Sequence, residues 1–521
     1  MQASRIPSSA DLLFITVAPA EAIRAAVRLT QSDGDLAGHI RMGEAILYSG
    51  ALPAHSLASY TAATEPMVAH GWLSEVFFAL LYRAGGLPMI AVVTAIIVAA
   101  THASVLLFLK RKGADPRWAL AAAFVSFALG LSHWLARPHM FSIAGSALTL
   151  FLLESNRPRR ALLFFGLFAL WANLHGAWLY GLLLIGAYVI GDVAEALIGT
   201  GRSEWLKRAR SDLALLAAAT AGTFVNPYVM GLHREVFSAV TSSSLAKNLE
   251  EYLPPKFNEF ASFPFLIVVL LTVVLLSLST RRMPFRWLAV VVLSLFFGLR
   301  SFRNIALFGI TAWPLIALHT ARTWPEARRR FPWFRDFVRL DALASVGWWS
   351  APVALALLAL GLNHGRIADK ELIADHFDSG RFPVVAVDSA RRAGLSGRVF
   401  SQWTWSGYML LAWPGASLHV DPLKFSDTTM ATFTRIEDVK PEWKAELDRW
   451  NIQTVMVKSK STLAKALSKE PAWRMWYQDT TATVFRRSGA PASGRPIILP
   501  QRRTSNTPPG NIDTADGAPR D

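Results

Sequence analysis

The sequence of 521 residues contains no cysteine. A disulfide framework, a thiolate zinc site, an iron–sulfur cluster and a cysteine nucleophile are therefore excluded. Charged residues are also scarce, at 17% of the chain, whereas soluble globular proteins carry roughly a quarter. Hydrophobic residues make up 52%, and the mean hydropathy is +0.31. These values argue against a water-soluble enzyme of this length.

Three common catalytic motifs are missing as well. The chain has no G-x-x-x-x-G-K-[S/T] phosphate loop, no G-x-S-x-G nucleophile elbow and no H-E-x-x-H zinc pair. It also lacks the charged relay in the middle of apolar segments that a proton-coupled transporter needs. Function must therefore be sought outside these classes.

Long apolar segments are what the chain has instead. Leu87–Leu109 carries no formal charge and reaches the roughly 20 residues that cross a bilayer. A first span over Leu12–Leu29 is interrupted by three charged residues. The other segments are shorter and need neighbours in a bundle: Ala119–Leu135, His139–Leu153, Ala161–Ala172, Ala177–Gly191, Leu213–Val225, Phe263–Thr280, Trp287–Leu299, Asn304–His319 and Ala344–Leu362. The sequence predicts a polytopic α-helical membrane protein with about eleven spans.

The net charge of +16 gives the orientation. Basic residues gather in alternate connections between the apolar segments, and such connections stay in the cytoplasm: 110–117, 157–160, 202–210, 281–286 and 322–339. The N-terminus is then cytoplasmic, whereas 30–86 and everything after about residue 363 face outward. Because orientation accounts for much of the charge, we expect membrane lipids and no nucleic acid as partners.

The outward C-terminal part has the composition of a small α/β domain. Short β-prone runs are Arg398–Gln402, Ser417–Asp421, Ile452–Val457 and Thr481–Arg486, and helical stretches are Val384–Arg392, Pro441–Trp450 and Thr462–Ser468. Their alternation predicts an open α/β sheet. After Ser488 the chain is rich in Pro, Gly, Ser and Thr and cannot bury a core. We therefore divide it into a transmembrane domain over 1–363, an extracytoplasmic domain over 364–487 and a disordered tail over 488–521.

The outward loop 30–86 contains two carboxylates, Asp33 and Asp35, separated by one glycine. They could act as a general base or hold a divalent cation such as Mg²⁺ or Mn²⁺. Alternatively, Asp35 could be the N-cap of a helix over Leu36–Ser49. The sequence leaves these roles open.

Polar groups also follow several spans on the outward side, among them Arg137, His175, Arg300 and Arg303. Each taken alone is explained equally well by local loop geometry. Together they lie on the same face as Asp33 and Asp35, and arginine beside a carboxylate suits a phosphate-bearing lipid. If this hypothesis holds, the two carboxylates lie within reach of His175 or Arg303 in an outward cavity.

The order of these motifs resembles the GT-C glycosyltransferases, relatives of the dolichyl-phosphate-mannose protein mannosyltransferases and of the lipid A aminoarabinose transferase. The motifs are Asp33-Gly-Asp-Leu-x-x-His-x-Arg-x-Gly, Ser59-Tyr-Thr, His70-x-Trp-Leu-x-Glu75, Arg137-Pro, Trp171-x-Asn-Leu-His-Gly176, Asn226-Pro-Tyr, Arg303-Asn, Phe382-Pro, Gly397-Arg-Val-Phe, Trp405-x-Gly-Tyr and Asp421. The resemblance covers nearly all of the chain up to about Arg487.

The resemblance implies an inverting enzyme of the bacterial inner membrane that moves a sugar from a polyprenyl-phosphate carrier to an extracytoplasmic glycan, lipid or protein. Asp35, and less directly Asp33, would be the catalytic or metal-binding residues. The substrate would be bound by His39, His70, Arg137, His175, Arg300 and Arg303.

The sequence departs from the family pattern at three places. Ser56 stands where relatives usually carry an aspartate, Ala37-Gly38 where they show two tryptophans, and Gly71 where an acid follows the histidine. These departures keep an alternative open, a non-catalytic or transport-type protein that serves the assembly or export of a surface polysaccharide.

Overall fold

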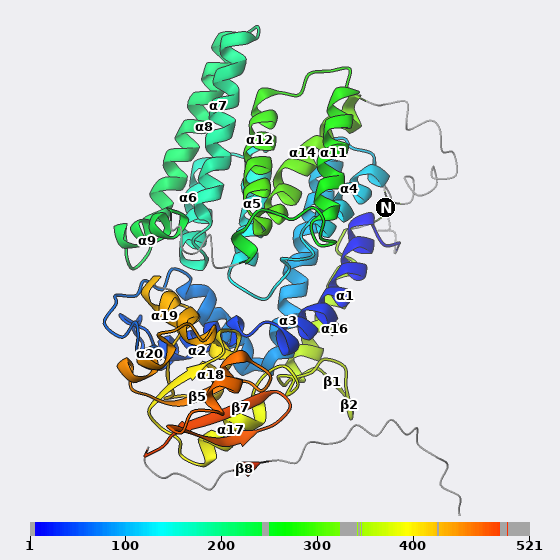
Figure 1. Ribbon diagram of the computed structural model, residues 1–521. Coiled ribbons are helices and arrows are strands. Elements are labelled where there is room, and N and C mark those ends of the chain that lie inside the picture. The colour runs from blue at the N-terminus through cyan, green and yellow to red at the C-terminus, as the bar shows by residue number, and fades with distance from the viewer. Residues whose placement is uncertain are drawn as a thin grey trace, which may run out of the picture.

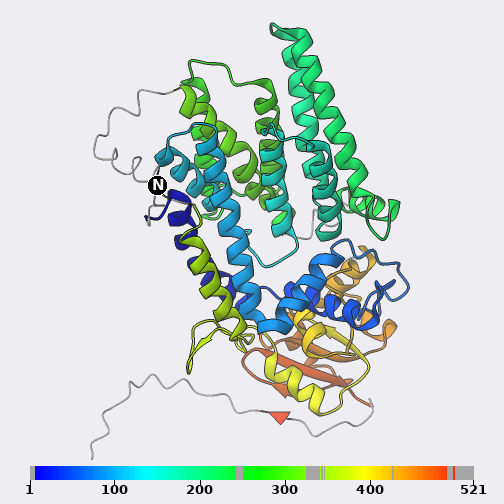
Figure 2. The ribbon, with the colours of Figure 1, turned by 180° about the vertical axis from the view of Figure 1, so that it is seen from behind.

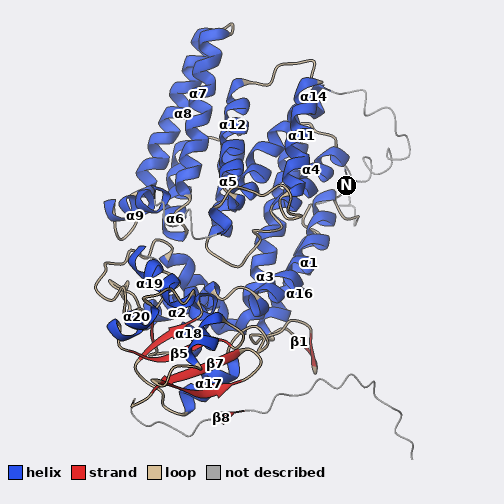
Figure 3. Cartoon of the chain, in the orientation of Figure 1, coloured by secondary structure: helices blue, strands red, loops and turns tan. Residues whose placement is uncertain are grey.

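The computed structural model describes residues 6–241, 250–323, 341, 344, 346–424, 427–489 and 497–498. Figure 1 shows a bundle of helices with a smaller part at one end, and Figure 3 shows that the strands lie in this smaller part. The segment 30–86, which the sequence predicts to face outward, lies between the two parts, against the C-terminal elements. The fold therefore joins segments from both ends of the chain.

Each of the eleven predicted spans overlaps a helix. The bundle contains α1 (Ser9–Gln31), α3 (Trp72–Arg111), α4 (Pro116–Leu129), α5 (His139–Leu153), α6 (Arg160–Leu174), α7 (Trp178–Ile198), α8 (Arg202–Thr223), α9 (Met230–Thr241), α11 (Phe263–Ser277), α12 (Phe285–Arg300), α13 (Ile305–Leu307), a π turn η3 (Phe308–Ala312), α14 (Trp313–Thr323) and α16 (Ser350–Leu362). In the described residues, three helical segments have the length and composition to cross a membrane, and five shorter helices are apolar. The total of eleven spans stays a prediction.

The basic connections meet at the end of the bundle away from the sheet. Lys112, after α3, contacts the Glu154 carboxylate after α5 at 3.0 Å, and the Trp287 indole of α12 donates to that carboxylate at 2.8 Å. Arg282 pairs with Glu195 of α7 at 2.7 Å. Figure 2 shows from behind that this end of the bundle lies opposite the sheet. The structure thus places these connections together, as the alternation of charge predicts; the run 322–339 lies outside the described residues.

The arginines of the first apolar segment, Arg24 and Arg28, form hydrogen bonds to a neighbouring loop. Arg24 of α1 donates to the backbone carbonyls of Leu131 at 2.9 Å and of Trp134 at 2.6 Å, and Arg28 donates to that of Ser132 at 3.1 Å. These carbonyls belong to the loop between α4 and α5, beyond the end of α4 at Leu129. The charged side of α1 therefore holds the loop that leads to Arg137.

The outward loop forms a helix of its own, α2 (Asp35–Ser49). The expectation that Asp35 is its N-cap is wrong by one residue, because the helix begins at Asp35 and Gly34 is the N-cap, with no side-chain hydrogen bond. The carboxylate of Asp33 instead accepts the backbone N–H of Asp35 at 3.2 Å. The Asp35 side chain is thereby left available for another role.

The C-terminal sheet has the order β4-β3-β5-β7-β6-β8, with both parallel and antiparallel pairs. Its strands are β3 (Arg398–Ser401), β4 (Ser417–Leu418), β5 (Ile452–Lys458), β6 (Trp473–Gln478), β7 (Ala482–Arg487) and β8 (Ile497–Ile498), and a hairpin of β1 (Arg366–Ile367) and β2 (Lys370–Glu371) precedes it. The helices are α17 (Val384–Arg392), α18 (Ser406–Ala412), α19 (Asp427–Glu437), α20 (Trp443–Arg449) and α21 (Thr462–Leu467). The α/β composition predicted this class of domain; β1, β2, β6, β8, α18 and α19 were not predicted. Most of the expected disordered tail lies outside the described residues, and two of its residues form β8.

The first loop extends the edge of this sheet. The backbone N–H of Leu418 donates to Ala58 at 2.9 Å, and that of Tyr60 donates to Leu418 at 3.1 Å. Ser56 donates to the buried Asp421 carboxylate at 2.6 Å. The loop is therefore fixed to β4 by backbone and side-chain bonds, as in strand addition.

Glycines bring the aspartate pair against the C-terminal domain. A Cβ at Gly407 of α18 would lie 2.2 Å from the carbonyl oxygen of Gly34, and one at Gly34 would lie 2.6 Å from that of Thr404. Both contacts are far inside ordinary van der Waals distance, so only glycine allows the two backbones to approach in this way. The segment from Asp33 to Asp35 is thus packed from one side by the bundle and from the other by α18.

Candidate active site

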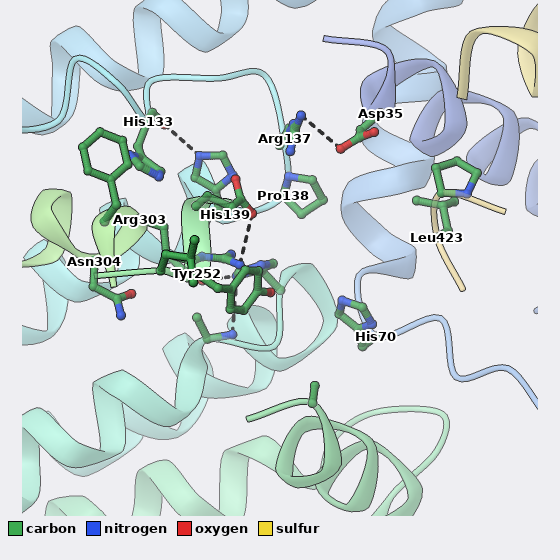
Figure 4. Close-up of a pocket in the computed structure, with 18 of the residues that line it drawn as sticks. Asp35, His70, His133, Arg137, Pro138, His139, Tyr252, Arg303, Asn304 and Leu423 are labelled. Carbon is green, nitrogen blue, oxygen red and sulfur yellow. Dashed lines mark hydrogen bonds and ion pairs between the residues drawn. The ribbon is translucent and has the colours of Figure 1, made fainter. Parts of the chain in front are cut away.

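A cavity of about 1140 Å³ lies between the bundle helices, α2 and the C-terminal domain. Figure 4 shows Asp35 and Leu423 on one side of it and Arg303 and Asn304 on the other, with Arg137 between. Leu423 comes from the C-terminal domain, so three separate parts of the sequence line one space. A cavity of this size is typical of binding sites for small molecules.

Arg137 joins the two aspartates. Its guanidinium donates to both oxygens of Asp33, with distances of 2.8 to 3.0 Å, and one nitrogen lies 3.0 Å from Asp35 Oδ2. The Asp33 side chain is 4% exposed, whereas that of Asp35 is 37% exposed and lines the cavity. Asp33 is therefore a buried counter-ion, and Asp35 is the carboxylate that faces the open space.

The two carboxyls differ in protonation because their partners differ. Burial alone would raise the pKa of Asp33, but the charge and hydrogen bonds of Arg137 hold that pKa below its usual value. Burial raises the pKa of Asp35; Arg137 opposes this shift and the charge of Asp33 adds to it. Asp33 thus stays ionised, and Asp35 binds a proton more readily than an ordinary carboxyl, as a general base requires.

The opposite side of the cavity carries the other cations. Arg303, in the short 3-10 turn η2 (Phe302–Asn304), lies 4.4 Å above the Tyr252 ring and 3.4 Å from Glu251. Lys256 also lines the cavity, 3.2 Å from Glu259. Tyr252 and Glu251 belong to η1 (Glu250–Tyr252). Arginine and lysine held in this way are suited to bind phosphate oxygens.

Five of the twelve histidines of the chain line the cavity: His39, His70, His133, His139 and His175. The Nδ1 of His175 accepts the backbone N–H of Ala177 at 3.4 Å and lies 2.7 Å from the hydroxyl of Ser142. Because Nδ1 accepts, the ring proton is on Nε2. Burial, with the nearby charges of His70 and Arg303, lowers the pKa of His175 well below its usual value. This imidazole is therefore a neutral hydrogen-bond donor at pH 7.

Of the eight predicted site residues, six line the cavity: Asp35, His39, His70, Arg137, His175 and Arg303. Asp33 lies behind them, against Arg137. Asp35 therefore shares one cavity with His175 and Arg303, whereas Asp33 does not line it; that this cavity faces outward stays a prediction. Arg300 is not brought to the site: it is exposed at the last residue of α12 and does not line the cavity. The helix ends there, and the separate turn η2 directs Arg303, three residues later, to the cavity.

Several lining residues were not predicted as site residues. Glu75 belongs to the motif His70-x-Trp-Leu-x-Glu75, but no role was predicted for it. The sequence signal that could have identified it is its position in the first turn of a helix, three residues after the start of α3. Trp403 and Lys424 come from the C-terminal domain. Only the tertiary packing of that domain on α2 brings them to the cavity, so local sequence patterns carried no signal for them.

The carboxylates fit a divalent cation poorly as they stand. Both oxygens of Asp33 are taken by Arg137, and within the described ranges no group of three or more His, Asp or Glu side chains is placed to hold a metal ion. Mg²⁺ and Mn²⁺ prefer several oxygen ligands. We therefore derive no step through a metal, and the metal role of Asp33 and Asp35 stays a prediction.

Comparison with known proteins gives a likeness in structure. No protein-family model and no curated protein matches this chain. The archaeal oligosaccharyltransferase AglB from Archaeoglobus fulgidus, in complex with an inhibitory peptide and a dolichol-phosphate, aligns over 91% of this chain and 74% of its own, with a TM-score of 0.52 and 11% identity. The apo form of the A. fulgidus oligosaccharyltransferase aligns over 93% and 75%, with a TM-score of 0.52 and 12% identity. ArnT from Cupriavidus metallidurans, bound to undecaprenyl phosphate, aligns over 93% and 99%, with a TM-score of 0.49 and 11% identity. From the oligosaccharyltransferase alignments, the chain has the fold of the GT-C membrane glycosyltransferases, the family that its sequence motifs resemble.

Proposed function

We propose that this chain is an inverting glycosyltransferase of the bacterial inner membrane, with the cavity and the C-terminal domain on the periplasmic side. It takes a sugar from a polyprenyl-phosphate carrier and transfers it to an extracytoplasmic acceptor. The observation that carries the proposal is the placement of Asp35, a carboxylate with a raised pKa, in one cavity with Arg137 and Arg303. The GT-C fold supports it, because the A. fulgidus oligosaccharyltransferase of that fold was captured with dolichol-phosphate.

The cationic side of the cavity suits the carrier. Arg303 and Lys256 line the cavity, where they can contact a phosphate group, and the apolar residues Ile143 and Leu307 of the bundle line the same cavity. When the bond between the sugar and the phosphate breaks, negative charge develops on the phosphate oxygen. Cations placed beforehand stabilise that charge, which makes the polyprenyl phosphate a good leaving group without a general acid.

The acidic side suits the acceptor. A nucleophilic O–H or N–H near Asp35 gives its proton to Oδ of that carboxylate while its lone pair attacks the anomeric carbon. The bonding pair leaves with the phosphate on the opposite face of the sugar. Such a single displacement inverts the configuration at the anomeric carbon. Arg137 and Asp33 keep Asp35 in position during the reaction, and neutral His70 and His175 offer hydrogen bonds to sugar hydroxyls.

The test is lipid and glycan profiling in a strain that lacks the gene. Complementation with the wild-type chain is compared with complementation by Asp35→Asn. The control is Glu44→Gln, which changes a carboxylate of the same helix that is paired with Arg41 and does not line the cavity. We expect the product to be lost with Asp35→Asn and kept with Glu44→Gln, at equal protein levels.

The same experiment addresses the alternative of a non-catalytic protein in polysaccharide assembly or export. If Asp35→Asn restores the full profile, the carboxylate performs no chemistry and the glycosyltransferase proposal is wrong. A profile in which finished polymer accumulates inside the cell would then indicate an export defect in the deletion strain.

A further inference from the structure

A second acid–base pair faces the cavity beside Asp35. His39 lies four residues after Asp35 in α2, so the two side chains share one face of the helix, and both line the cavity. The Nδ1 of His39 is 3.4 Å from Oε1 of Glu75, in the first turn of α3. The proposed reaction gives this pair no role.

Glu75 is held rigidly. A Cβ at Gly43 of α2 would lie 2.0 Å from the carbonyl oxygen of Glu75, so α2 and α3 cross at backbone distance where Glu75 sits. The Glu75 residue is only 4% exposed. Its Oε2 is buried and has no hydrogen-bond partner within the part of the chain that the structure describes.

A buried carboxylate needs a counter-charge or a hydrogen bond. Within the described residues, the His39 ring lies 3.4 Å from the Glu75 carboxylate, whereas Arg137 is paired with Asp33 and Asp35. A carboxylate only accepts, so contact with Glu75 places the ring proton of neutral His39 on Nδ1. The Nε2 lone pair is then free to accept a proton. The same logic operates in carboxylate–histidine pairs that activate nucleophiles.

We propose that His39 and Glu75 form a proton relay that resets Asp35 after each transfer. This inference rests on the proposed function. Asp35 takes the proton of the acceptor as the new glycosidic bond forms and polyprenyl phosphate leaves with the bonding pair. The Asp35 carboxyl then gives that proton to Nε2 of His39, and Asp35 returns to the carboxylate. Glu75 balances the charge of the imidazolium until the proton reaches the solvent of the cavity.

The direction of the relay follows from the charges that face the two groups. Arg137, 3.0 Å from Asp35, favours the ionised carboxylate, and Glu75 favours the charged ring. His70 and His175 line the same cavity, and His70 lies within electrostatic range of both Glu75 and His39.

The pairing itself is tested without any substrate. The full-length chain is labelled with ¹⁵N-histidine in detergent, His39→Gln assigns the resonance, and the nitrogen shifts report the tautomer. We expect the Nδ1–H tautomer in the wild type and in Glu44→Gln, and a change to Nε2–H in Glu75→Leu, which removes the acceptor. Glu75→Gln keeps an acceptor oxygen and should keep Nδ1–H. An Nε2–H tautomer in the wild type, or the same tautomer in Glu75→Leu, overturns the pairing.

The relay is tested by activity. With the carrier-linked sugar fraction of membranes as donor, His39→Ala should lower the turnover number by roughly tenfold or more, with the KM for the donor unchanged. Imidazole added to the buffer should restore turnover in His39→Ala and should not affect Asp35→Asn. Glu75→Gln should lower the turnover number while binding is kept. Failure of imidazole to restore His39→Ala overturns the relay. Full activity of Asp35→Asn overturns the proposed function instead, so the two failures are distinct.

Discussion

The contact between Gly407 and Gly34 gives the sharpest test of how the site is assembled. In Gly407→Ala the new methyl group would lie 2.2 Å from the carbonyl oxygen of Gly34, whereas ordinary contact begins at 3.4 Å. The clash meets backbone, not a flexible side chain, so α18 and the start of α2 must move apart by about 1.2 Å. Overpacking of this kind costs about 1–3 kcal/mol, and the better helix propensity of alanine offsets about 1 kcal/mol of that cost.

The effect on function should exceed the effect on stability. Asp35 directly follows Gly34, so it moves with the displaced backbone. A misplacement of about 1 Å can lower a rate by about 100-fold. We therefore expect Gly407→Ala to lower transfer by roughly that factor, while the melting temperature falls by only a few degrees.

The assay is sugar transfer by the purified chain, with thermal unfolding measured on the same samples. The matched control is Gly166→Ala, because a Cβ at this exposed glycine of α6 meets nothing within 4 Å. The control should keep wild-type activity. Wild-type activity in Gly407→Ala as well would show that α18 does not hold the Asp33–Asp35 segment in place, and the account of the site would be refuted.

Four further predictions concern the charges of the site. Since burial raises the pKa of Asp35, the base should be lost as the pH falls through a value above the ordinary carboxyl range; a pH–rate profile with its acid limb at or below that range would contradict this. Asp33→Asn should lower the free energy of unfolding by about 3–5 kcal/mol, because it leaves Arg137 with a single partner. As a control, Glu44→Gln should change the free energy of unfolding by less than about 0.5 kcal/mol. The pKa of Asp33 is held below its usual value, so its stabilisation is present at pH 7 and should disappear as the pH falls through that lowered value, which unfolding measured across acid pH would show. Chelation with EDTA should leave transfer unchanged, because Arg137 occupies both oxygens of Asp33; loss of activity that Mg²⁺ or Mn²⁺ restores would show instead that the carboxylates bind metal.

The sequence was most informative about features that depend on the local sequence alone, such as the length of an apolar segment. Apolar length predicted the helices, and the boundaries of α5 and α17 agree with the predicted ranges. The grouping of Asp35, Arg137, His175 and Arg303 followed from their common place at the outward ends of spans. That argument needs only the alternation of the chain across the bundle, which sequence can supply.

The sequence could not predict contacts between residues that lie far apart in the chain. Arg24 and Arg28 counted against a first span, yet they bind carbonyls of the loop before Arg137, and no local pattern predicts such partners. Ser56 counted as the loss of a carboxylate, yet it binds Asp421. The resemblance favoured Asp35 over Asp33, but the division into an exposed carboxylate and a buried counter-ion depends on how Arg137 approaches the pair, which no local pattern shows.

The docking of the first loop on β4 has a consequence for the folding of the protein during its synthesis. Ser56 and Asp421 are separated by 365 positions in the chain. At roughly 5–20 residues per second, a ribosome needs roughly 20–70 s to add the second partner after the first. Until then the loop has no strand to pair with, and the segment before Asp35 lacks its packing against α18. The cavity is therefore complete only after the C-terminal domain has been synthesised and has folded, so nascent and truncated copies lack one of its walls.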